Sequence, residues 1–214
     1  TFTAEEEQTF SMSKAVETLQ YSVNGGEWTT LGTSTVTFGG SNGELRLRGK
    51  SKTGTAGPSD YATVKFGNSV SVACSGDIRT LVDYENFKTV DTSNARFFCL
   101  FFACSSLTSA PALPATILAK SCYKYMFYGC TNLIIAPELP AFTLTEGCYS
   151  FMFYGCKNLN QVTMLATDVS ANNCLYLWLY NVSGTGALTK ANTMISLPSG
   201  SSGIPTGWTI VNKD

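Results

Sequence analysis

The chain has no histidine and few charged residues, and both shortages limit what it can do. Charged residues make up 14% of its 214 residues, against about 25% in a typical globular protein. A Ser-His-Asp or Cys-His nucleophile needs an imidazole base, so these catalytic arrangements are excluded. Neither a glycine-rich phosphate loop before a helix nor the paired carboxylates of a glycosidase can be recognised. We therefore expect no enzymatic activity, no catalytic residue and no cofactor.

Long apolar runs and concentrated basic charge are also missing. No run reaches the roughly 20 apolar residues of a transmembrane helix, so we expect no membrane span in this chain. The net charge is −1, and a nucleic-acid-binding face, which needs clustered basic residues, is not expected. The chain begins at Thr1 without a start Met, which we interpret as a mature or trimmed form whose export signal has been removed. A lipid anchor in the precursor remains open.

Residues 1–72 predict a small all-β sandwich domain. Asn24-Gly25 lies between two short strand-like runs and supplies the positive φ angles of a tight hairpin turn. Leu45 and Leu47 alternate with Arg46 and Arg48, which predicts a strand with one apolar and one wet face. Several such runs separated by turn residues are typical of antiparallel sandwiches.

A repeat replaces this pattern from about residue 78. CSSLTSAPALPATILAKSCYKYMFYG at 104–129 returns as CTNLIIAPELPAFTLTEGCYSFMFYG at 130–155 and, less regularly, as CKNLNQVTMLATDVSANNCLYLWLYN at 156–181. A fourth, irregular copy precedes them. A fixed period of 26 residues with Leu-x-x-Ala-Pro-x-Leu indicates a leucine-rich-repeat solenoid. Each unit buries its apolar face only by stacking on its neighbours.

Each repeat predicts a short strand followed by a short helix. Leu107–Ala110 reads as the strand and Pro111 ends it, because proline has no amide proton to donate. A helical spacing of i, i+4, i+5 and i+8 then relates Cys122, Met126, Phe127 and Cys130. The predicted fold is an α/β leucine-rich-repeat solenoid of about four coils, with parallel strands plus short helices. Its predicted domains are a β-sandwich at 1–72, the solenoid at 73–182 and a C-terminal cap at 183–214, in which Trp208 covers the last coil or, alternatively, stacks on a ligand.

The cysteines form two series that step by 26 residues, namely Cys104, Cys130, Cys156 and Cys122, Cys148, Cys174. In a helix, Cys122 and Cys130 would lie roughly 12 Å apart along the axis, beyond the reach of about 7 Å that a disulfide allows. Zinc favours closely spaced Cys pairs or His partners, which are absent. We expect no metal site and no disulfide but two columns of buried free thiols, with a single accidental disulfide as the alternative. Cys74 and Cys99 receive no role.

Two further registers are aromatic. Phe102, Tyr128, Tyr154 and Tyr180 share one of them, and Cys99, Tyr125, Phe151 and Leu177 share the other. Both lie off the predicted buried face, and large rigid rings provide contact area at little entropy cost. The candidate ligand-binding residues are therefore Tyr128, Tyr154, Tyr180, Tyr125 and Phe151. Alternatively, these rings pack against each other and against adjacent loops.

The repeated Leu-x-x-Ala-Pro-x-Leu-Pro-Ala…Cys-Tyr-x-x-Met-Phe-x-Gly-Cys closely resembles the BspA-type leucine-rich repeats of bacterial surface proteins. The resemblance covers residues 78–182, and the closing Gly203–Ile210 segment is similar to the tail of many such proteins. It implies export, surface display and non-enzymatic binding, with a host or bacterial surface protein as partner. The sequence leaves two alternatives open, a carbohydrate-binding accessory protein of a polysaccharide-utilising bacterium and a structural spacer.

Overall fold

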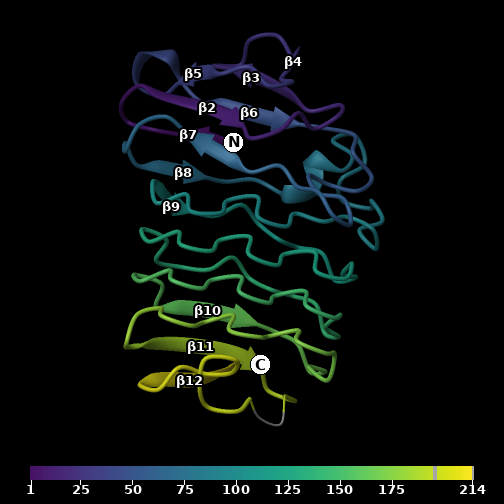
Figure 1. Ribbon diagram of the computed structural model, residues 1–214, viewed down its shortest axis with the longest axis vertical. Coiled ribbons are helices and arrows are strands. Elements are labelled where there is room, and N and C mark those ends of the chain that lie inside the picture. Colours follow the sequence, from purple (N-terminus) through teal and green to yellow (C-terminus); the bar gives the residue numbers. More distant parts are fainter. Residues whose placement is uncertain (195–196, 214) are drawn as a thin grey trace.

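The computed structural model describes residues 1–194 and 197–213, and shows antiparallel strands at the N-terminal end of a stack of coils (Figure 1). The prediction of an α/β fold with short helices is wrong. Across the described residues there is no α-helix, and the only helical pieces are the short 3-10 turns η1 (Gly40–Asn42) and η2 (Ile78–Leu81). The fold is almost entirely built of strands and turns. Residues 195, 196 and 214 of the predicted cap lie outside the described residues.

Two sheets form the N-terminal part. One sheet has the order β4-β3-β6-β1-β8-β9, and the other has the order β5-β2-β7. Their strands are β1 (Phe2–Thr3), β2 (Gln8–Met12), β3 (Gln20–Val23), β4 (Thr29–Thr30), β5 (Val36–Phe38), β6 (Leu45–Arg48), β7 (Val64–Phe66), β8 (Val72–Cys74) and β9 (Leu107–Ser109). The predicted hairpin forms between β3 and β4, with Asn24 and Gly25 at positive φ. Leu45 is fully buried in β6 and Arg46 is exposed, as their alternation predicted.

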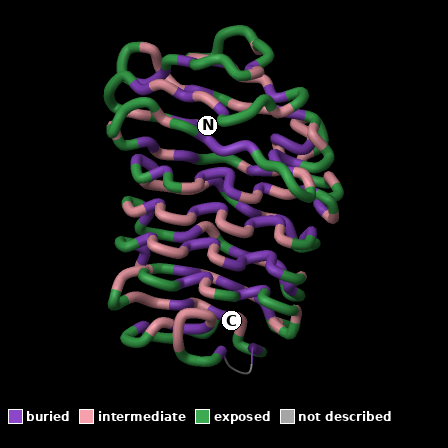
Figure 2. The backbone as a smooth tube through the Cα atoms, viewed as in Figure 1, coloured by how far each residue is buried: buried purple, intermediate pink, exposed green. Residues whose placement is uncertain are grey.

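The larger sheet leads directly into the coils. β9 belongs to the first regular repeat, yet it pairs in parallel with β8 of the N-terminal part. One hydrophobic core therefore continues from Phe2 to Trp208 without a break. Buried segments recur at corresponding places in successive coils (Figure 2). The division into separate domains at residues 72 and 182 stays a prediction.

A parallel three-stranded sheet closes the other end. It has the order β10-β11-β12, formed by Gln161–Met164, Gly186–Ala191 and Trp208–Lys213. Trp208 starts the last strand, is buried, and donates its indole Nε1–H to the Ser183 carbonyl at 2.8 Å. Its ring therefore serves the packing of this end, because one edge and its donor are already occupied.

A ladder of tight turns occupies the place of the predicted helices. Met126 N–H donates to the Tyr123 carbonyl at 3.1 Å, and Tyr128 N–H donates to Tyr125 at 3.2 Å, which is the i to i+3 bond of a β-turn. The intervening amides point along the stack, as Phe127 N–H donates to the Met152 carbonyl of the next coil at 2.9 Å. Every second amide thus closes a turn and every other one joins two coils.

This ladder has a four-residue period, which explains the wrong prediction. Positive φ angles recur at every fourth residue, in the series Ser121, Tyr125, Gly129, then Gly147, Phe151, Gly155, then Asn173, Leu177, Asn181. Across residues 121–130, two buried residues alternate with two partly exposed ones. Over nine residues, a period of four is hard to distinguish from the 3.6 residues of a helix. A short isolated helix also forms at a nucleation cost, which the coil-to-coil hydrogen bonds avoid.

The predicted stacking of side chains 26 residues apart is confirmed. The ring centroids of Phe101 and Phe127 lie 5.4 Å apart with an interplanar angle of 3°, and those of Phe127 and Phe153 lie 5.6 Å apart with an angle of 2°. All three rings are fully buried. The sequence period therefore identifies which side chains lie above one another, although the backbone that carries them is not helical.

Candidate binding surface

The predicted outer register forms a continuous ring column. Centroid separations are 4.9 Å between Phe102 and Tyr128, 4.7 Å between Tyr128 and Tyr154, and 4.9 Å between Tyr154 and Tyr180. Unlike the buried phenylalanines, these rings are partly exposed, and Tyr180 at the end of the column is exposed. The turn ladder sets this spacing, because corresponding residues of successive coils are held by the same hydrogen bonds.

A second column lies beside the first. Tyr125 and Phe151 stack at 4.6 Å and 8°. The ring centroids of Tyr125 and Tyr128 lie 5.8 Å apart, and those of Phe151 and Tyr154 lie 6.0 Å apart, so the two columns are in contact. The structure therefore brings all five predicted residues, Tyr125, Tyr128, Phe151, Tyr154 and Tyr180, onto one surface.

Three further rings, which the sequence did not predict as part of this surface, extend it. Tyr176 meets Phe151 edge-on at 5.2 Å, and Phe98 lies 5.7 Å from Tyr125 and 4.9 Å from Tyr61. We call the whole set the aromatic wall: Tyr61, Phe98, Phe102, Tyr125, Tyr128, Phe151, Tyr154, Tyr176 and Tyr180. Phe98 and Tyr176 share one 26-residue register, but the two positions between them hold Lys124 and Ser150. The register therefore could not be recognised as aromatic from the sequence. Tyr61 comes from the N-terminal part and has no repeat partner.

The stacked rings present their edges to solvent rather than their faces. Neighbouring planes within the Phe102–Tyr128–Tyr154 run differ by at most 9°, and the centroid separations leave no room between them. Each inner ring is therefore covered on both faces by the rings before and after it. Solvent meets ring edges and phenol hydroxyls, and the outer face of Tyr180 lies at the end of the column. Sugar rings stack on open aromatic faces, so the inner column offers them little.

The aromatic wall carries almost no charge. Desolvation, followed by the neighbouring Tyr128 and Tyr180 hydroxyls, raises the pKa of Tyr154 above its ordinary value. Desolvation, followed by Cys99, also raises the pKa of Tyr125. These phenols are therefore neutral at physiological pH. The Lys124 ammonium lies 5.5 Å from the Tyr125 ring centroid and places one positive charge beside the wall.

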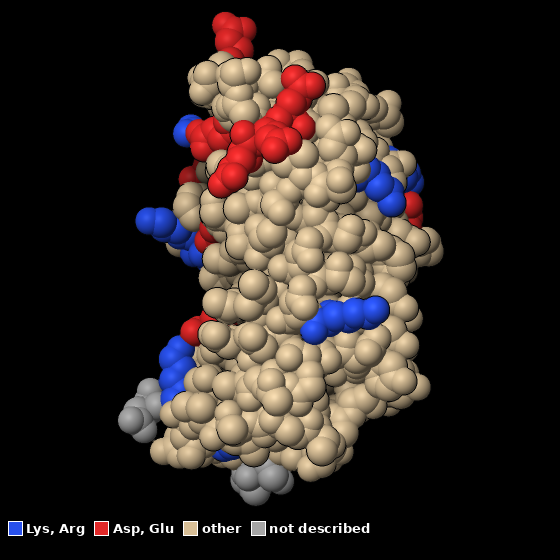
Figure 3. Space-filling view, turned by 90° about the vertical axis from the view of Figure 1, so that its left-hand side faces the viewer, with Lys and Arg blue, Asp and Glu red and all other residues tan. Residues whose placement is uncertain are grey.

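Charge gathers elsewhere on the molecule. Figure 3 shows acidic side chains over the N-terminal strands and isolated lysines and arginines on a face that is otherwise uncharged. Ion pairs on the surface include Lys120–Glu146, which bridges two coils at 2.8 Å, and Lys213–Glu138 at 2.6 Å. Both pairs are solvent-exposed, and such pairs stabilise proteins by only about 0–1 kcal/mol.

The cysteines lie in the interior as free thiols. All eight are buried, and the Cys130 and Cys156 Sγ atoms donate to the Phe101 and Phe127 carbonyls at 3.0 and 2.9 Å. Desolvation raises the pKa of Cys156 to about 12, so its thiolate is not populated near neutral pH. Cys74 and Cys99, for which the sequence predicts no role, are also buried, and desolvation raises their pKa values to about 12 and about 11. Across residues 1–194 and 197–213, no group of three His, Cys, Asp or Glu residues has the arrangement of a metal site.

None of the helices found in the described residues is long and apolar enough to cross a membrane. Comparisons of the chain with protein-family models, with curated proteins and with solved structures found no match.

Proposed function

We propose that this chain is a non-enzymatic binding module of a secreted or cell-surface protein, and that the aromatic wall is its contact surface for a protein partner. The observation that carries the proposal is the nine-ring wall itself, which joins four coils and remains partly exposed. Large exposed apolar patches on soluble proteins commonly mark interaction sites, and tyrosine is among the residues enriched at binding hot spots. The sequence resemblance to BspA-type repeats of bacterial surface proteins supports the same assignment.

A protein partner fits the geometry better than a glycan. The edges of the stacked rings and the row of phenol hydroxyls suit a partner that packs apolar side chains against the edges and forms hydrogen bonds with the hydroxyls. A glycan would need open ring faces, and the parallel stacking of Tyr128 on Tyr154 leaves none there. Glycan binding therefore remains the second candidate, with the exposed Tyr180 at the column's end as the place where it would occur.

The state of the cysteines is compatible with the proposed location outside the cytoplasm. Exported proteins meet oxidising surroundings in which exposed thiols pair or react. Burial raises the pKa of Cys104 and Cys148 to about 12, which keeps both as unreactive thiols. The eight free cysteines are therefore no obstacle to export.

The test compares two triple variants in a pull-down from mucosal extract and on a glycan array. Replacing Tyr128, Tyr154 and Tyr180 with Ser removes the rings, while replacing them with Phe keeps the rings and removes only the hydroxyls. We expect the Ser variant to lose the captured protein and the Phe variant to retain most of it. A matched control replaces Lys120, Glu146 and Asn172, which form another exposed 26-residue register, with Ser.

Circular dichroism and thermal unfolding establish that each variant is folded before binding is compared. Capture that is unchanged in the folded Ser variant would contradict the proposal. Binding on the glycan array alone, lost in a Tyr180→Ser variant, would replace the protein partner with a carbohydrate.

A further inference from the structure

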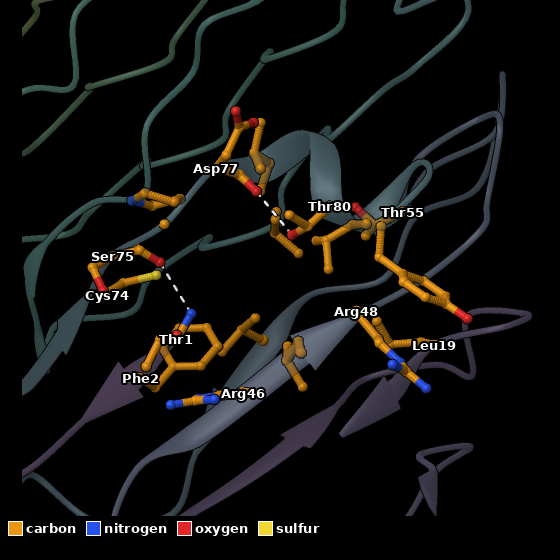
Figure 4. Close-up of a pocket in the computed structure, with 18 of the residues that line it drawn as sticks. Thr1, Phe2, Leu19, Arg46, Arg48, Thr55, Cys74, Ser75, Asp77 and Thr80 are labelled. Atoms are coloured by element: carbon orange, nitrogen blue, oxygen red, sulfur yellow. Dashed lines mark hydrogen bonds between the residues drawn. The ribbon is translucent and has the colours of Figure 1, made fainter. Parts of the chain in front are cut away.

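A cavity of about 310 Å³ opens where the six-stranded sheet is incomplete (Figure 4). β1 pairs with β6 only through Phe2 and Leu45. Farther along, β6 is followed by Gly49, whose N–H donates to the carbonyl of Thr80 in η2 at 2.9 Å. Between these two closures, no strand of the described chain pairs with this edge of Arg46–Arg48. The resulting gap connects the outer face of the sheet with the core.

The floor of this cavity is apolar. Almost fully buried apolar side chains line it, among them Phe2, Met12, Leu19, Val64, Leu100 and Phe101. Thr55 also lines the cavity and is 6% exposed, yet its Oγ1 has no hydrogen-bond partner. A buried hydroxyl without a partner destabilises the fold, because its lost hydrogen bonds to water are not replaced. A ligand with one polar atom in an otherwise apolar body would satisfy it.

Arg48 stands at the mouth and is held in a fixed orientation. Its Cζ lies 4.1 Å from the ring centroid of Trp28 and 4.2 Å from that of Tyr84. Its Nε–H donates to Gln20 Oε1 at 2.9 Å. Both faces of the guanidinium and one of its donors are thus occupied, which leaves the Nη groups for another partner.

No carboxylate of the described residues forms an ion pair with Arg48. The two other charged side chains that line the cavity are compensated, because Arg46 pairs with Glu44 and Asp77 pairs with Arg79. Among the charged side chains that line the cavity, Arg48 is therefore the one without a counter-charge, and the Thr1 ammonium, which donates to the Ser75 carbonyl at 3.0 Å, is a further positive group in the lining. A guanidinium fork matches a carboxylate in two parallel hydrogen bonds, and a fixed fork loses little entropy on binding.

We propose that this cavity binds a small organic carboxylate with an apolar body of roughly ten heavy atoms, a size that we set from a void equal to about ten waters. The carboxylate contacts the Nη groups of Arg48, and the body enters the gap and lies on the apolar floor. A polar atom of the body meets Thr55 Oγ1. This arrangement of an apolar pocket with a few placed polar groups is typical of small-molecule sites. The inference is independent of the aromatic wall.

The first experiment titrates the whole chain with 3-phenylpropanoate and, in parallel, with the neutral 3-phenylpropanamide, and follows backbone amides by NMR. We expect saturable shifts for residues that line the cavity and at least about tenfold weaker binding of the amide, because hydrogen bonds to a charged group are the stronger ones. Equal affinities, or shifts confined to other surfaces, would overturn the proposal without any variant.

Three variants then assign the contacts. Arg48→Gln should reduce carboxylate affinity to the level of the amide, and Leu47→Trp, which adds bulk to the lining, should abolish binding of both probes. Lys124→Gln removes a cation near another aromatic ring, remote from the cavity, and should change neither. An undiminished preference for the carboxylate in folded Arg48→Gln would overturn the role of Arg48. Tighter binding of a blocked trivaline peptide than of 3-phenylpropanoate would show that the gap takes an added strand instead.

Discussion

Two columns of aromatic rings lie one residue apart in the sequence. Their rings stack in the same way, but one column is buried and the other is partly exposed to solvent. The inner column, Phe101, Phe127 and Phe153, is fully buried, whereas the outer column, Phe102, Tyr128, Tyr154 and Tyr180, is partly exposed. Both stack with nearly parallel planes, except that the last outer ring, Tyr180, is tilted by 27° to Tyr154. Stacking therefore reports the spacing of the coils, which is common to both columns. Burial determines how much each ring stabilises the fold and whether it remains available to a partner.

The largest expected effect is the loss of stability at alkaline pH, which acts through the buried groups of the inner region. Desolvation raises the pKa of Cys104, Cys148 and Cys156 from an ordinary value of 9.0 to about 12. A raised folded-state pKa means that the stabilisation is complete below pH 9 and is lost as pH rises toward 12. Each of these thiols is therefore harder to ionise in the folded chain than in the unfolded one, and its ionisation at high pH favours unfolding.

We therefore expect the free energy of unfolding, from urea titrations at pH 7 to 11, to fall steeply above pH 9. Desolvation raises the pKa of buried Tyr123 and Tyr149 well above the ordinary value, so the absorbance of their ionised phenols should rise only with unfolding. A constant free energy of unfolding up to pH 11 would contradict the burial of these thiols.

Removing an inner ring should have the next largest effect. Phe127→Ala deletes a ring that is 0% exposed and lies between Phe101 and Phe153. We expect a loss of about 3–5 kcal/mol in the free energy of unfolding, as for other buried Phe→Ala changes. Urea denaturation monitored by circular dichroism measures it, and Phe127→Leu, which keeps most of the volume, serves as the milder control. A loss below about 1 kcal/mol would show that the inner column is loosely packed.

Removing the matching outer ring should cost less. Tyr154→Ala deletes the ring between Tyr128 and Tyr180, and each such ring pair stabilises by about 0.5–1.5 kcal/mol. We expect a loss of about 1–2 kcal/mol in the same urea assay and almost none for Tyr154→Phe. A loss as large as that of Phe127→Ala would remove the distinction between the two columns.

The smallest effect tests the turn ladder that carries both columns. Ala103 has φ +59°, while the corresponding positions of the next two coils hold Gly129 and Gly155 at φ +69° and +73°. A left-handed conformation costs a residue with Cβ about 1–2 kcal/mol, so Gly129→Ala should destabilise by about 1 kcal/mol. Ala103→Gly should be neutral or slightly stabilising, since relief of strain opposes the greater entropy of unfolded glycine. Thermal unfolding measures both changes. A stabilising Gly129→Ala together with a destabilising Ala103→Gly would show that these positions are not left-handed.

The parts that sequence reasoning predicted correctly depend on short-range rules. Asn24-Gly25 encodes its turn through φ preference, and the alternation of Leu45 with Arg46 encodes a strand face. The 26-residue period likewise identified Phe101, Phe127 and Phe153 as stacked partners. The five predicted wall residues came from two registers of this period, Tyr128, Tyr154 and Tyr180 in one and Tyr125 and Phe151 in the other, because residues that repeat at one period lie in one line.

The parts that it missed depend on contacts between distant segments. Arg48 is clamped by Trp28 and Tyr84, which no repeat or local pattern connects. Tyr61 reaches the wall from the N-terminal part and meets Phe98 there. The cavity exists because β1 pairs with β6 over so short a stretch, which local propensity does not reveal.

The amino-acid sequence alone determined which side chains of this protein lie above one another, because a constant repeat length leaves one register for stacked coils. Only the tertiary structure decided the backbone that carries them. Turn and helix share nearly the same periodicity over nine residues, and the turn ladder prevails because half of its amides bond to a neighbouring coil that exists only once the chain has folded.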